Sequence, residues 1–207
     1  MQLLRNMNLN IAPNRRVFIA GQTQSGKTNL VQNLISKLSN FFILDIKWQY
    51  SEFGAIVHSI ADLELAARSG VTKFIYQSYS IDVEEFNQIC KFILYNLKNI
   101  TFIVEEVQNF CSKHSIPEYF KSLITMSQGD SQQFASKVGV WCISQRPANV
   151  HNDIITQGMV ITFHLHEIDA DALLVIPRDM ILSLGRFWFA VWDDLKQSDN
   201  ITIFPPL

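Results

Sequence analysis

One motif in the sequence has residue types and spacing that suit the binding of a phosphate chain. Eight residues match G-x-x-x-x-G-K-[ST], with glycines at Gly21 and Gly26 followed by Lys27 and Thr28. The glycines let the backbone turn successive N–H groups inward around phosphate oxygens. In such a loop Lys27 reaches the β- and γ-phosphates, and the Thr28 hydroxyl binds Mg²⁺. We therefore expect ATP and Mg²⁺ here, with the nucleotide held by Gly21, Gln22, Thr23, Gln24, Ser25, Gly26, Lys27, Thr28 and Asn29.

Two adjacent carboxylates, Glu105 and Glu106, follow the apolar run 101–104. Because strand side chains alternate between faces, at least one of the two must lie near the core, where an isolated charge is costly. Phosphoryl chemistry supplies a reason for the pair: Glu105 would support Mg²⁺, and Glu106 would act as the base that orients or deprotonates the attacking water. The alternative is a strand that ends in two solvated acids.

A glutamine, Gln145, follows the next apolar run, which ends in Cys142-Ile-Ser144. An amide at the tip of a strand can hydrogen-bond both the γ-phosphate and the attacking water. Its alternative role is simple capping of a loop. The predicted catalytic groups are therefore Lys27, Glu106 and Gln145, and the predicted metal ligands are Thr28 and Glu105.

The elements that must position these groups alternate between short apolar runs and helical periods of 3.6 residues. The sequence predicts strands at 16–20, 41–45, 72–76, 101–104, 138–144 and 159–165, helices at 27–38, 83–97, 117–126 and 169–175, a loop at 127–133, and a closing β-hairpin from 186–192 and 201–204. This order predicts an α/β P-loop fold, with a mainly parallel sheet flanked by helices on both faces. In such sheets ligands bind beyond the carboxyl ends of the strands.

The length, the charge and the cysteine content of the chain limit its number of domains, its way of binding nucleic acid and its compartment. The 207 residues suit one domain, expected as an arm over 1–15, an ATPase core over 16–192 and a C-terminal strand and tail over 193–207. Charged residues are 17% of the chain against a usual fraction of about 25%. The net charge of −2 gives no overall basic field for nucleic acid, so any polyanion must be held by local loops or by many copies of the chain. Three cysteines without a C-x-x-C pair favour a reduced intracellular compartment, and no apolar window has the length of a membrane span.

Taken together, the loop, the paired acids and Ser144-Gln145-Arg146-Pro147 resemble the FtsK/HerA class of ring-forming DNA pumps. Three further segments are similar to motifs of that class. They are the acid-containing end of the second strand at 43–47, the D-E-A-x-N-F motif at 105–110, and the helix-and-strand ending at 168–188. The resemblance covers roughly residues 16 to 192. For a chain of this size it is greatest with the genome-packaging ATPases of membrane-containing icosahedral viruses, in particular those of the turreted icosahedral viruses of Sulfolobus.

The resemblance implies a RecA-like, Mg²⁺-dependent ATPase that assembles into a ring, a hexamer or a pentamer, and translocates double-stranded DNA without sequence preference. It implies packaging of a viral genome into a preformed capsid. It also implies capsid or viral membrane proteins as partners, and a location in the host-cell cytoplasm or at a capsid vertex of the virion.

The sequence departs from the class in two places. Glu105 stands where the class usually has Asp, so its metal geometry would differ. In cellular members, the helix before the strand that carries the γ-phosphate sensor supplies an arginine to the next subunit. Here that strand is 138–144, and the segment before it, 133–137, contains no arginine. The arginine finger would then be Arg146, Arg178 or Arg186, with Lys137 as an imperfect substitute.

Two other functions are compatible with a phosphate loop. A nucleoside-monophosphate-type kinase of small molecules has the same size, but it needs an arginine-rich lid that the C-terminal third does not suggest. A nucleotide-gated switch would have no need of a water-activating Glu106. Two minor features favour ordinary roles: His164 and His166 are predicted on a solvated strand face rather than at a metal, and the aromatic residues of 187–192 are predicted in core and subunit packing.

Overall fold

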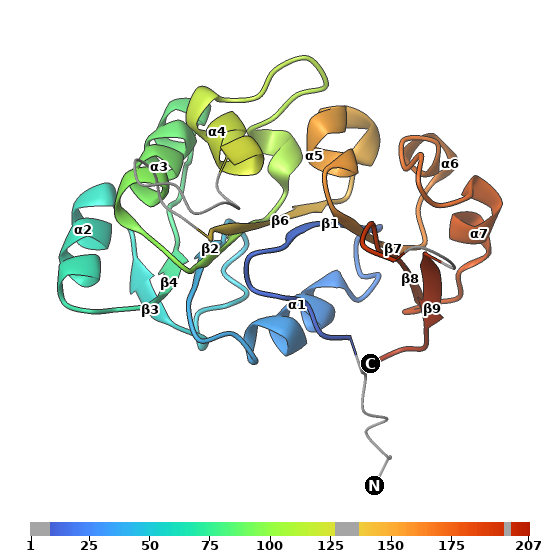
Figure 1. Cartoon of the computed structure of the whole chain (residues 1–207), viewed down its shortest axis with the longest axis horizontal. Coiled ribbons are helices and arrows are strands. Elements are labelled where there is room, and N and C mark those ends of the chain that lie inside the picture. The colour runs from blue at the N-terminus through green and yellow to red at the C-terminus, as the bar shows by residue number, and fades with distance from the viewer. Residues whose placement is uncertain (1–8, 127–136, 197–199) are drawn as a thin grey trace, which may run out of the picture.

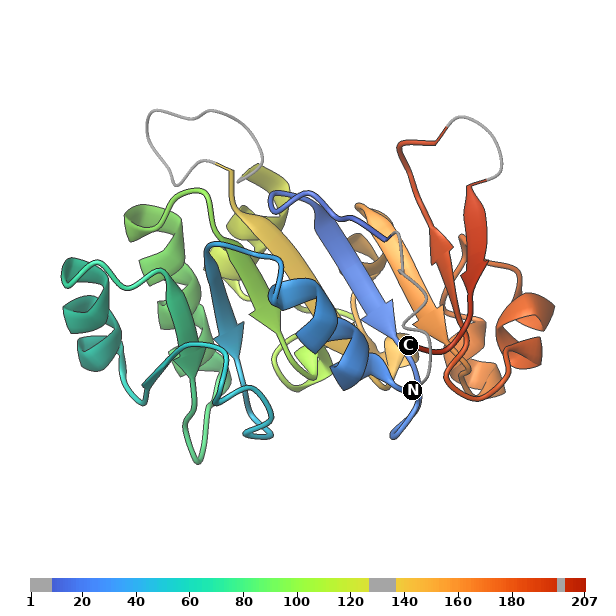
Figure 2. The same ribbon diagram turned by 90° about the horizontal axis from the view of Figure 1, so that it is seen from below.

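The computed structural model describes residues 9–126, 137–196 and 200–207, and its centre is one nine-stranded sheet. The strands lie in the order β3-β4-β2-β5-β6-β1-β7-β8-β9, and Figure 2 shows them as a twisted sheet that extends across the molecule. The strands are β1 Arg16–Ala20, β2 Phe41–Leu44, β3 Ala55–Val57, β4 Lys73–Tyr76, β5 Thr101–Val104, β6 Gly139–Ser144, β7 Met159–Phe163, β8 Phe189–Trp192 and β9 Ile201–Phe204. The helices are α1 Lys27–Ile35, α2 Ile60–Arg68, α3 Val83–Asn96, η1 Val107–Asn109, α4 Glu118–Met126, η2 Pro147–Asn149, α5 Asn152–Thr156, α6 Glu167–Ala170 and α7 Arg178–Ser183.

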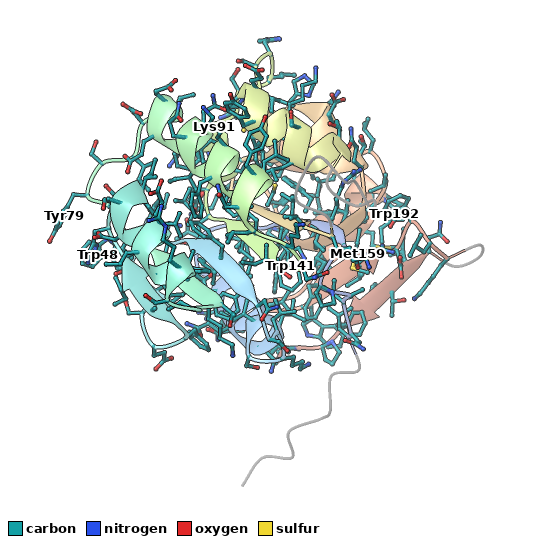
Figure 3. All side chains as sticks on the ribbon, turned by 60° about the vertical axis from the view of Figure 1, so that its left-hand side comes forward. Trp48, Tyr79, Lys91, Trp141, Met159 and Trp192 are labelled. Atoms are coloured by element: carbon teal, nitrogen blue, oxygen red, sulfur yellow. The ribbon has the colours of Figure 1, made fainter. Side chains whose placement is uncertain are left out.

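The sheet is parallel from β3 to β7, as the alternation of strands and helices predicts. Its central strands are buried on both faces, which explains why they read as continuous apolar runs. Trp141, labelled in Figure 3, lies inside the molecule on β6 and is 1% exposed. The predicted fold class, with a mainly parallel sheet between helices, is confirmed.

The two faces of the sheet are covered unequally. Figure 1 shows α1 on one face and α3, α4 and α5 on the other. The apolar residues of α1 form one core cluster together with Leu9 and Ile11, and the helices from α2 to α7 contribute to the second cluster. Within the ranges given above, no helix is long and apolar enough to cross a bilayer.

The described part of the N-terminal arm, residues 9–15, lies against the sheet. The Thr101 hydroxyl donates a hydrogen bond to the Pro13 carbonyl at 2.8 Å. A Cβ atom on Gly139 would lie 2.0 Å from that same carbonyl oxygen. The arm can therefore follow this path only because position 139 carries no side chain.

Several elements differ from the sequence prediction. The prediction missed β3, which has three residues, and α2, which buries only Leu63. The sequence did contain a signal for the start of α2, since Ser59 is a residue type preferred at the N-cap. In the structure its side chain accepts a hydrogen bond from the Asp62 N–H. The helix predicted at 169–175 is wrong: α6 begins at Glu167 and makes only one turn. The short α5 and α7 were also missed, because few residues repeat in helices of five and six residues.

The predicted closing hairpin is confirmed as the antiparallel pair β8 and β9. Its first strand begins three residues later than predicted, at Phe189. The Trp188 N–H donates to the Gly185 carbonyl at 3.0 Å, and Phe187 has φ 65°, so these residues form a turn rather than a strand. The predicted loop at 127–133 lies outside the described residues.

Candidate nucleotide-binding site

The carboxyl edge of the sheet brings together the groups singled out from the sequence. Gly21 follows β1, Asp45 follows β2, Glu105 follows β5 and Gln145 follows β6, and these four strands are neighbours. The Gly21 N–H donates to the Ser144 carbonyl at 3.3 Å, which ties the start of the loop to the end of β6. Glu105, Gln145 and residues 23–29 of the loop and helix start are among the residues that line a cavity of about 410 Å³ at this edge.

The loop between β1 and α1 has the backbone that its glycines predict. Gly26 has φ 106° and Gln24 has φ 60°, both in the left-handed region. A Cβ on Gly21 would lie 2.6 Å from the Ser25 Oγ and 2.8 Å from the Phe163 Cβ, so only glycine fits. The chain then enters α1 at Lys27, which adds the positive end of a helix dipole to the loop. The local structure suits an anion such as a phosphate.

The Lys27 ammonium is directed into its own loop. Its Nζ donates to the carbonyl oxygens of Gly21 at 2.6 Å and Gln22 at 2.7 Å. Burial lowers the pKa of Lys27 to about 8, although the nearby carboxylate of Glu106 raises it. A phosphate would offset this loss of hydration, because it would give the buried ammonium a negative partner.

Glu105 is a buried carboxylate in which one of the two oxygens has no hydrogen-bond partner. Its Oε1 accepts a hydrogen bond from the Tyr50 hydroxyl at 3.2 Å, while its Oε2 is buried without a partner. Burial, together with the negative charge of Asp45, raises the pKa of Glu105 to about 7. Since Thr28 lines the same cavity, the free oxygen and the hydroxyl are oxygen donors that fit Mg²⁺.

Asp45 holds the loop that supplies Tyr50. Its two carboxylate oxygens accept hydrogen bonds from the N–H groups of Gln49 at 2.9 Å and Tyr50 at 3.0 Å, and from the Gln77 side chain at 2.8 Å. Asp45 is fully buried, so these three donors compensate its charge. Asp45 thus fixes the turn after β2 rather than facing the cavity.

Glu106 leaves the strand in an unusual conformation. Its φ of 48° is rare for a residue other than glycine and turns its side chain towards Lys47, Gln108 and Gln145. All three donate to its carboxylate. Burial alone would raise the pKa of Glu106, but these hydrogen bonds and the charge of Lys47 outweigh it and lower the pKa. The carboxylate is therefore held ionised at the edge of the cavity.

Gln145 connects the phosphate loop to Glu106. Its Oε1 accepts a hydrogen bond from the Thr23 hydroxyl at 2.6 Å, and its Nε2 donates to Glu106. Ser144, the last residue of β6, donates to the Gln108 Oε1 at 2.7 Å and so positions the other amide that holds Glu106. This arrangement can couple the occupancy of the loop to the position of the carboxylate.

Four polar residues of this site were not assigned a role from the sequence: Lys47, Gln49, Tyr50 and Gln108. Lys47 and Gln108 lie inside the segments 43–47 and 105–110, so the motifs contained a signal for them. Tyr50 carried no signal, because its contact with Glu105 joins residues that are 55 positions apart.

The three candidate arginines differ in their surroundings and in their partners. Arg146 is exposed beside Gln145, and Arg186 lies over the Phe187 ring at 4.7 Å. Arg178 pairs with three carboxylates of its own chain, those of Glu167, Asp171 and Asp179. The segment 133–137 lies outside the described residues except for Lys137.

The two histidines expected on a strand face lie elsewhere. β7 ends at Phe163, so His164 and His166 belong to the connection that leads into α6. The strand prediction was wrong because it ran two residues too far. Across residues 9–126, 137–196 and 200–207, no group of three His, Cys, Asp or Glu residues is placed to hold a metal ion.

No protein-family model matches the sequence, and no curated protein matches it. Solved structures do match. The genome packaging NTPase B204 of Sulfolobus turreted icosahedral virus 2 in complex with ATP-gammaS is 17% identical and gives a TM-score of 0.77 over 95% of this chain and 99% of that chain. Its complex with AMPPCP gives 0.75 at 18% identity, over 95% of this chain and 100% of that chain. The N-terminal domain of zonular occludens toxin from Neisseria meningitidis gives 0.52 at 14% identity, over 95% of this chain and 96% of that chain.

These likenesses establish the fold, which is that of the P-loop NTPases. The resemblance to the packaging NTPases of Sulfolobus turreted icosahedral viruses, which the sequence motifs indicated, is confirmed at the level of structure.

Proposed function

We propose that this chain is an Mg²⁺-dependent ATPase that translocates double-stranded DNA into a viral capsid. One observation carries the proposal. Lys27, Thr28, Glu105, Glu106 and Gln145 come from three separate segments and line one cavity at the carboxyl edge of the sheet. The likeness of the fold to a packaging NTPase over nearly the whole of both chains supports the choice among ATPase functions.

The loop and its lysine would hold the triphosphate. The backbone of 21–29 would surround the phosphates, and the Lys27 ammonium would exchange its carbonyl partners for β- and γ-phosphate oxygens. Thr28 and the free oxygen of Glu105 would hold Mg²⁺, which neutralises charge on the phosphates when it is bound. Glu105 has a longer side chain than Asp, and its Oε1 accepts a hydrogen bond from the Tyr50 hydroxyl, which would help to orient the other oxygen.

Glu106 would be the base for the attacking water. Its lowered pKa keeps the carboxylate ionised, as acceptance of a proton requires. Gln145 would sense the γ-phosphate, since it bonds both Thr23 of the loop and Glu106. A bound triphosphate would accept hydrogen bonds from donors that now hold Glu106. The Glu106 carboxylate would then be free to act as the base once the substrate is in place.

Assembly into a ring would account for DNA handling by a chain whose net charge is −2. A ring multiplies a few contacts per subunit and need not hold the duplex tightly at each step. A hexamer or a pentamer, docked on capsid or viral membrane proteins at a vertex, is the assembly we propose.

The test is ATP hydrolysis with and without long duplex DNA, measured together with the mass in solution. We expect DNA to stimulate hydrolysis and activity to rise with protein concentration. Lys27→Ala should abolish nucleotide binding, and Glu106→Gln should keep ATP bound while it loses at least about two orders of magnitude in turnover. Hydrolysis that is indifferent to DNA, in a monomeric protein, would contradict the proposal.

A kinase of small molecules would be separated from this function by an acceptor assay. Such a kinase needs arginines that close over the phosphates, and Arg178 is already paired with three carboxylates of its own chain. Transfer of the γ-phosphate to a nucleoside monophosphate at a rate above hydrolysis would favour the kinase.

A further inference from the structure

The edge of the sheet opposite the phosphate cavity is the one at which the parallel strands begin. The register aligns the first residues of four neighbouring strands, which are Lys73, Phe41, Thr101 and Gly139. β1 lies beside β6 and begins at the same edge, and Figure 2 shows these strands starting at its upper side. This amino edge of the sheet is formed by the segments 12–16, 36–40, 69–73, 97–101 and 137–139.

The amino edge carries a strong excess of positive charge. It makes up about one ninth of the chain, yet it contains six of the 17 Lys and Arg residues and none of the 19 Asp and Glu residues. The six are Arg15, Arg16, Lys37, Lys73, Lys98 and Lys137. Since the whole chain has a net charge of −2, its positive charge is concentrated at this edge. Such a local field attracts anions even when the molecule as a whole does not.

The lysines of the amino edge are more available than its arginines. Arg15 pairs with two carboxylates of the turn between β8 and β9, and Arg16 donates to Gln157 and to a backbone carbonyl of α4. Lys37 and Lys98 are exposed, and neither forms an ion pair with a residue that the structure describes. These two lysines therefore keep their charge for a partner outside the chain.

Polar groups and a cavity lie between the lysines. A cavity of about 350 Å³ at the amino edge is lined by Pro13, Asn14, Lys37, Ser39, Asn40, Asn99 and Lys137. The Asn40 side chain donates to the Asn99 carbonyl at 3.2 Å, and the Thr101 N–H donates to the Asn40 carbonyl at 3.3 Å. The turns that carry the lysines are thus fixed to one another. Lysine, asparagine and serine side chains are among the usual hydrogen-bond donors to phosphate oxygens of DNA.

The spacing of the lysines suits a phosphate backbone. Lys73, Lys37, Lys98 and Lys137 belong to four consecutive strands, β4, β2, β5 and β6. Because neighbouring strands are about 4.8 Å apart, the row extends over about 14 Å. One strand of a DNA duplex rises about 3.4 Å per phosphate, so this row corresponds to about four phosphates.

The surroundings of the lysines favour a duplex over other polyanions. None of the large apolar side chains that are exposed in the described part of the chain belongs to the amino edge. A lipid surface is usually bound with the help of apolar side chains that enter it, and a single strand with the help of aromatic rings that stack on its bases. Charge and amide donors without such side chains fit the outside of a double helix.

We propose that the amino edge binds the phosphate backbone of double-stranded DNA, at the end of the sheet opposite the nucleotide cavity. The inference rests on the proposed function and adds the surface at which the duplex is held. Lys37 and Lys98 contact phosphates directly, and Asn14, Ser39 and Asn40 offer further donors beside them. No group at this edge reads a base, so binding is independent of sequence.

The experiment measures binding of the full chain to labelled duplex DNA over a range of salt concentrations, together with ATP hydrolysis with and without DNA. The double variant Lys37→Gln/Lys98→Gln is compared with Lys113→Gln/Lys121→Gln, which removes the same charge from exposed lysines outside the amino edge. We expect the first variant to bind DNA about tenfold more weakly and the slope of log affinity against log salt to fall by about 0.9 per lost contact. Its hydrolysis without DNA should be unchanged.

The matched variants should separate position from net charge. Lys113→Gln/Lys121→Gln should bind DNA nearly as the wild-type protein does, and Lys37→Arg/Lys98→Arg should retain affinity because it keeps both charges. Equal losses in the two Gln variants would overturn the inference, because net charge alone would then explain them.

Other ligands supply the remaining outcomes. Tighter binding to single-stranded DNA, or to vesicles of anionic phospholipid, than to duplex DNA would also overturn the inference. If DNA stimulates hydrolysis equally in the wild-type protein and in Lys37→Gln/Lys98→Gln, the duplex is held elsewhere and the proposed function stands. If DNA neither binds nor stimulates the wild-type protein, the proposed function itself is contradicted.

Discussion

The Lys47 ammonium contacts the Glu106 carboxylate across the carboxyl edge of the sheet, although the two residues are 59 positions apart. The contact joins the turn after β2 to the end of β5, which are adjacent strands. It places a positive charge next to the proposed base, beside the cavity that would hold the triphosphate. Lys47 is therefore a positioning residue for Glu106.

Lys47→Met should lower turnover by about tenfold and leave ATP affinity nearly unchanged, because the carboxylate loses its charged partner while the phosphate loop stays intact. Lys47→Arg should restore much of the activity, since a guanidinium can also donate to a carboxylate. Steady-state turnover and nucleotide affinity, measured on both variants, provide the check. An equal loss in both variants would mean that the charge is not what matters.

Tyr50→Phe should weaken the response to Mg²⁺. The hydroxyl is the one donor to Glu105 that the structure shows, so its removal leaves both carboxylate oxygens of a buried group without a partner. We expect the Mg²⁺ concentration for half-maximal hydrolysis to rise several-fold. Because Phe keeps the buried ring, binding of ATP without metal should be unchanged, and a change there would point to a general disturbance of the site.

An arginine from a neighbouring subunit should complete the site, and the structure narrows the choice. Arg178 is engaged by three carboxylates, so Arg178→Ala should reduce hydrolysis less than Arg146→Ala or Arg186→Ala. Each inactive arginine variant should recover some hydrolysis when it is mixed with Glu106→Gln chains, because some interfaces then pair an intact base with an intact finger. If no mixture recovers turnover, hydrolysis is completed within one chain.

Gly139→Ala should destabilise the fold by about 1–3 kcal/mol, because the new Cβ would overlap the Pro13 carbonyl and displace the arm. Gly70→Ala is the control. Gly70 has φ 83° but no atom within 4 Å of its Cβ position, so only backbone strain of about 1 kcal/mol applies. Chemical denaturation of both variants measures the difference. A larger loss at Gly70 would show that the contact with the arm is unimportant.

The three cysteines should be unreactive in the folded protein. Burial raises the pKa of Cys111 to about 12 and raises the pKa values of Cys90 and Cys142 well above their usual range. At pH 8 fewer than about one Cys111 side chain in a thousand is then a thiolate. A thiol reagent should label none of the three within minutes, and all three in denaturant. Rapid labelling of the native protein would show that the structure opens locally.

The sequence alone predicted the parts of this protein that depend on neighbouring residues. The phosphate loop between β1 and α1, and the acids and the glutamine at the ends of β5 and β6, are short motifs whose chemistry follows from residue type and spacing. The buried parallel strands could also be predicted, because burial on both faces makes each of them a continuous apolar run. Elements with little periodicity, such as β3 and α5, gave no comparable signal.

The tertiary structure alone decided how these motifs act on one another. Strand order places Lys47 and Gln145 on either side of Glu106, and it places Tyr50 at Glu105. The positive φ values of Glu106 and Phe187 likewise have no local cause in the sequence. Contacts between distant segments depend on how the sheet is ordered and how closely its layers pack, and these depend on the whole core, so no single stretch of residues contains them.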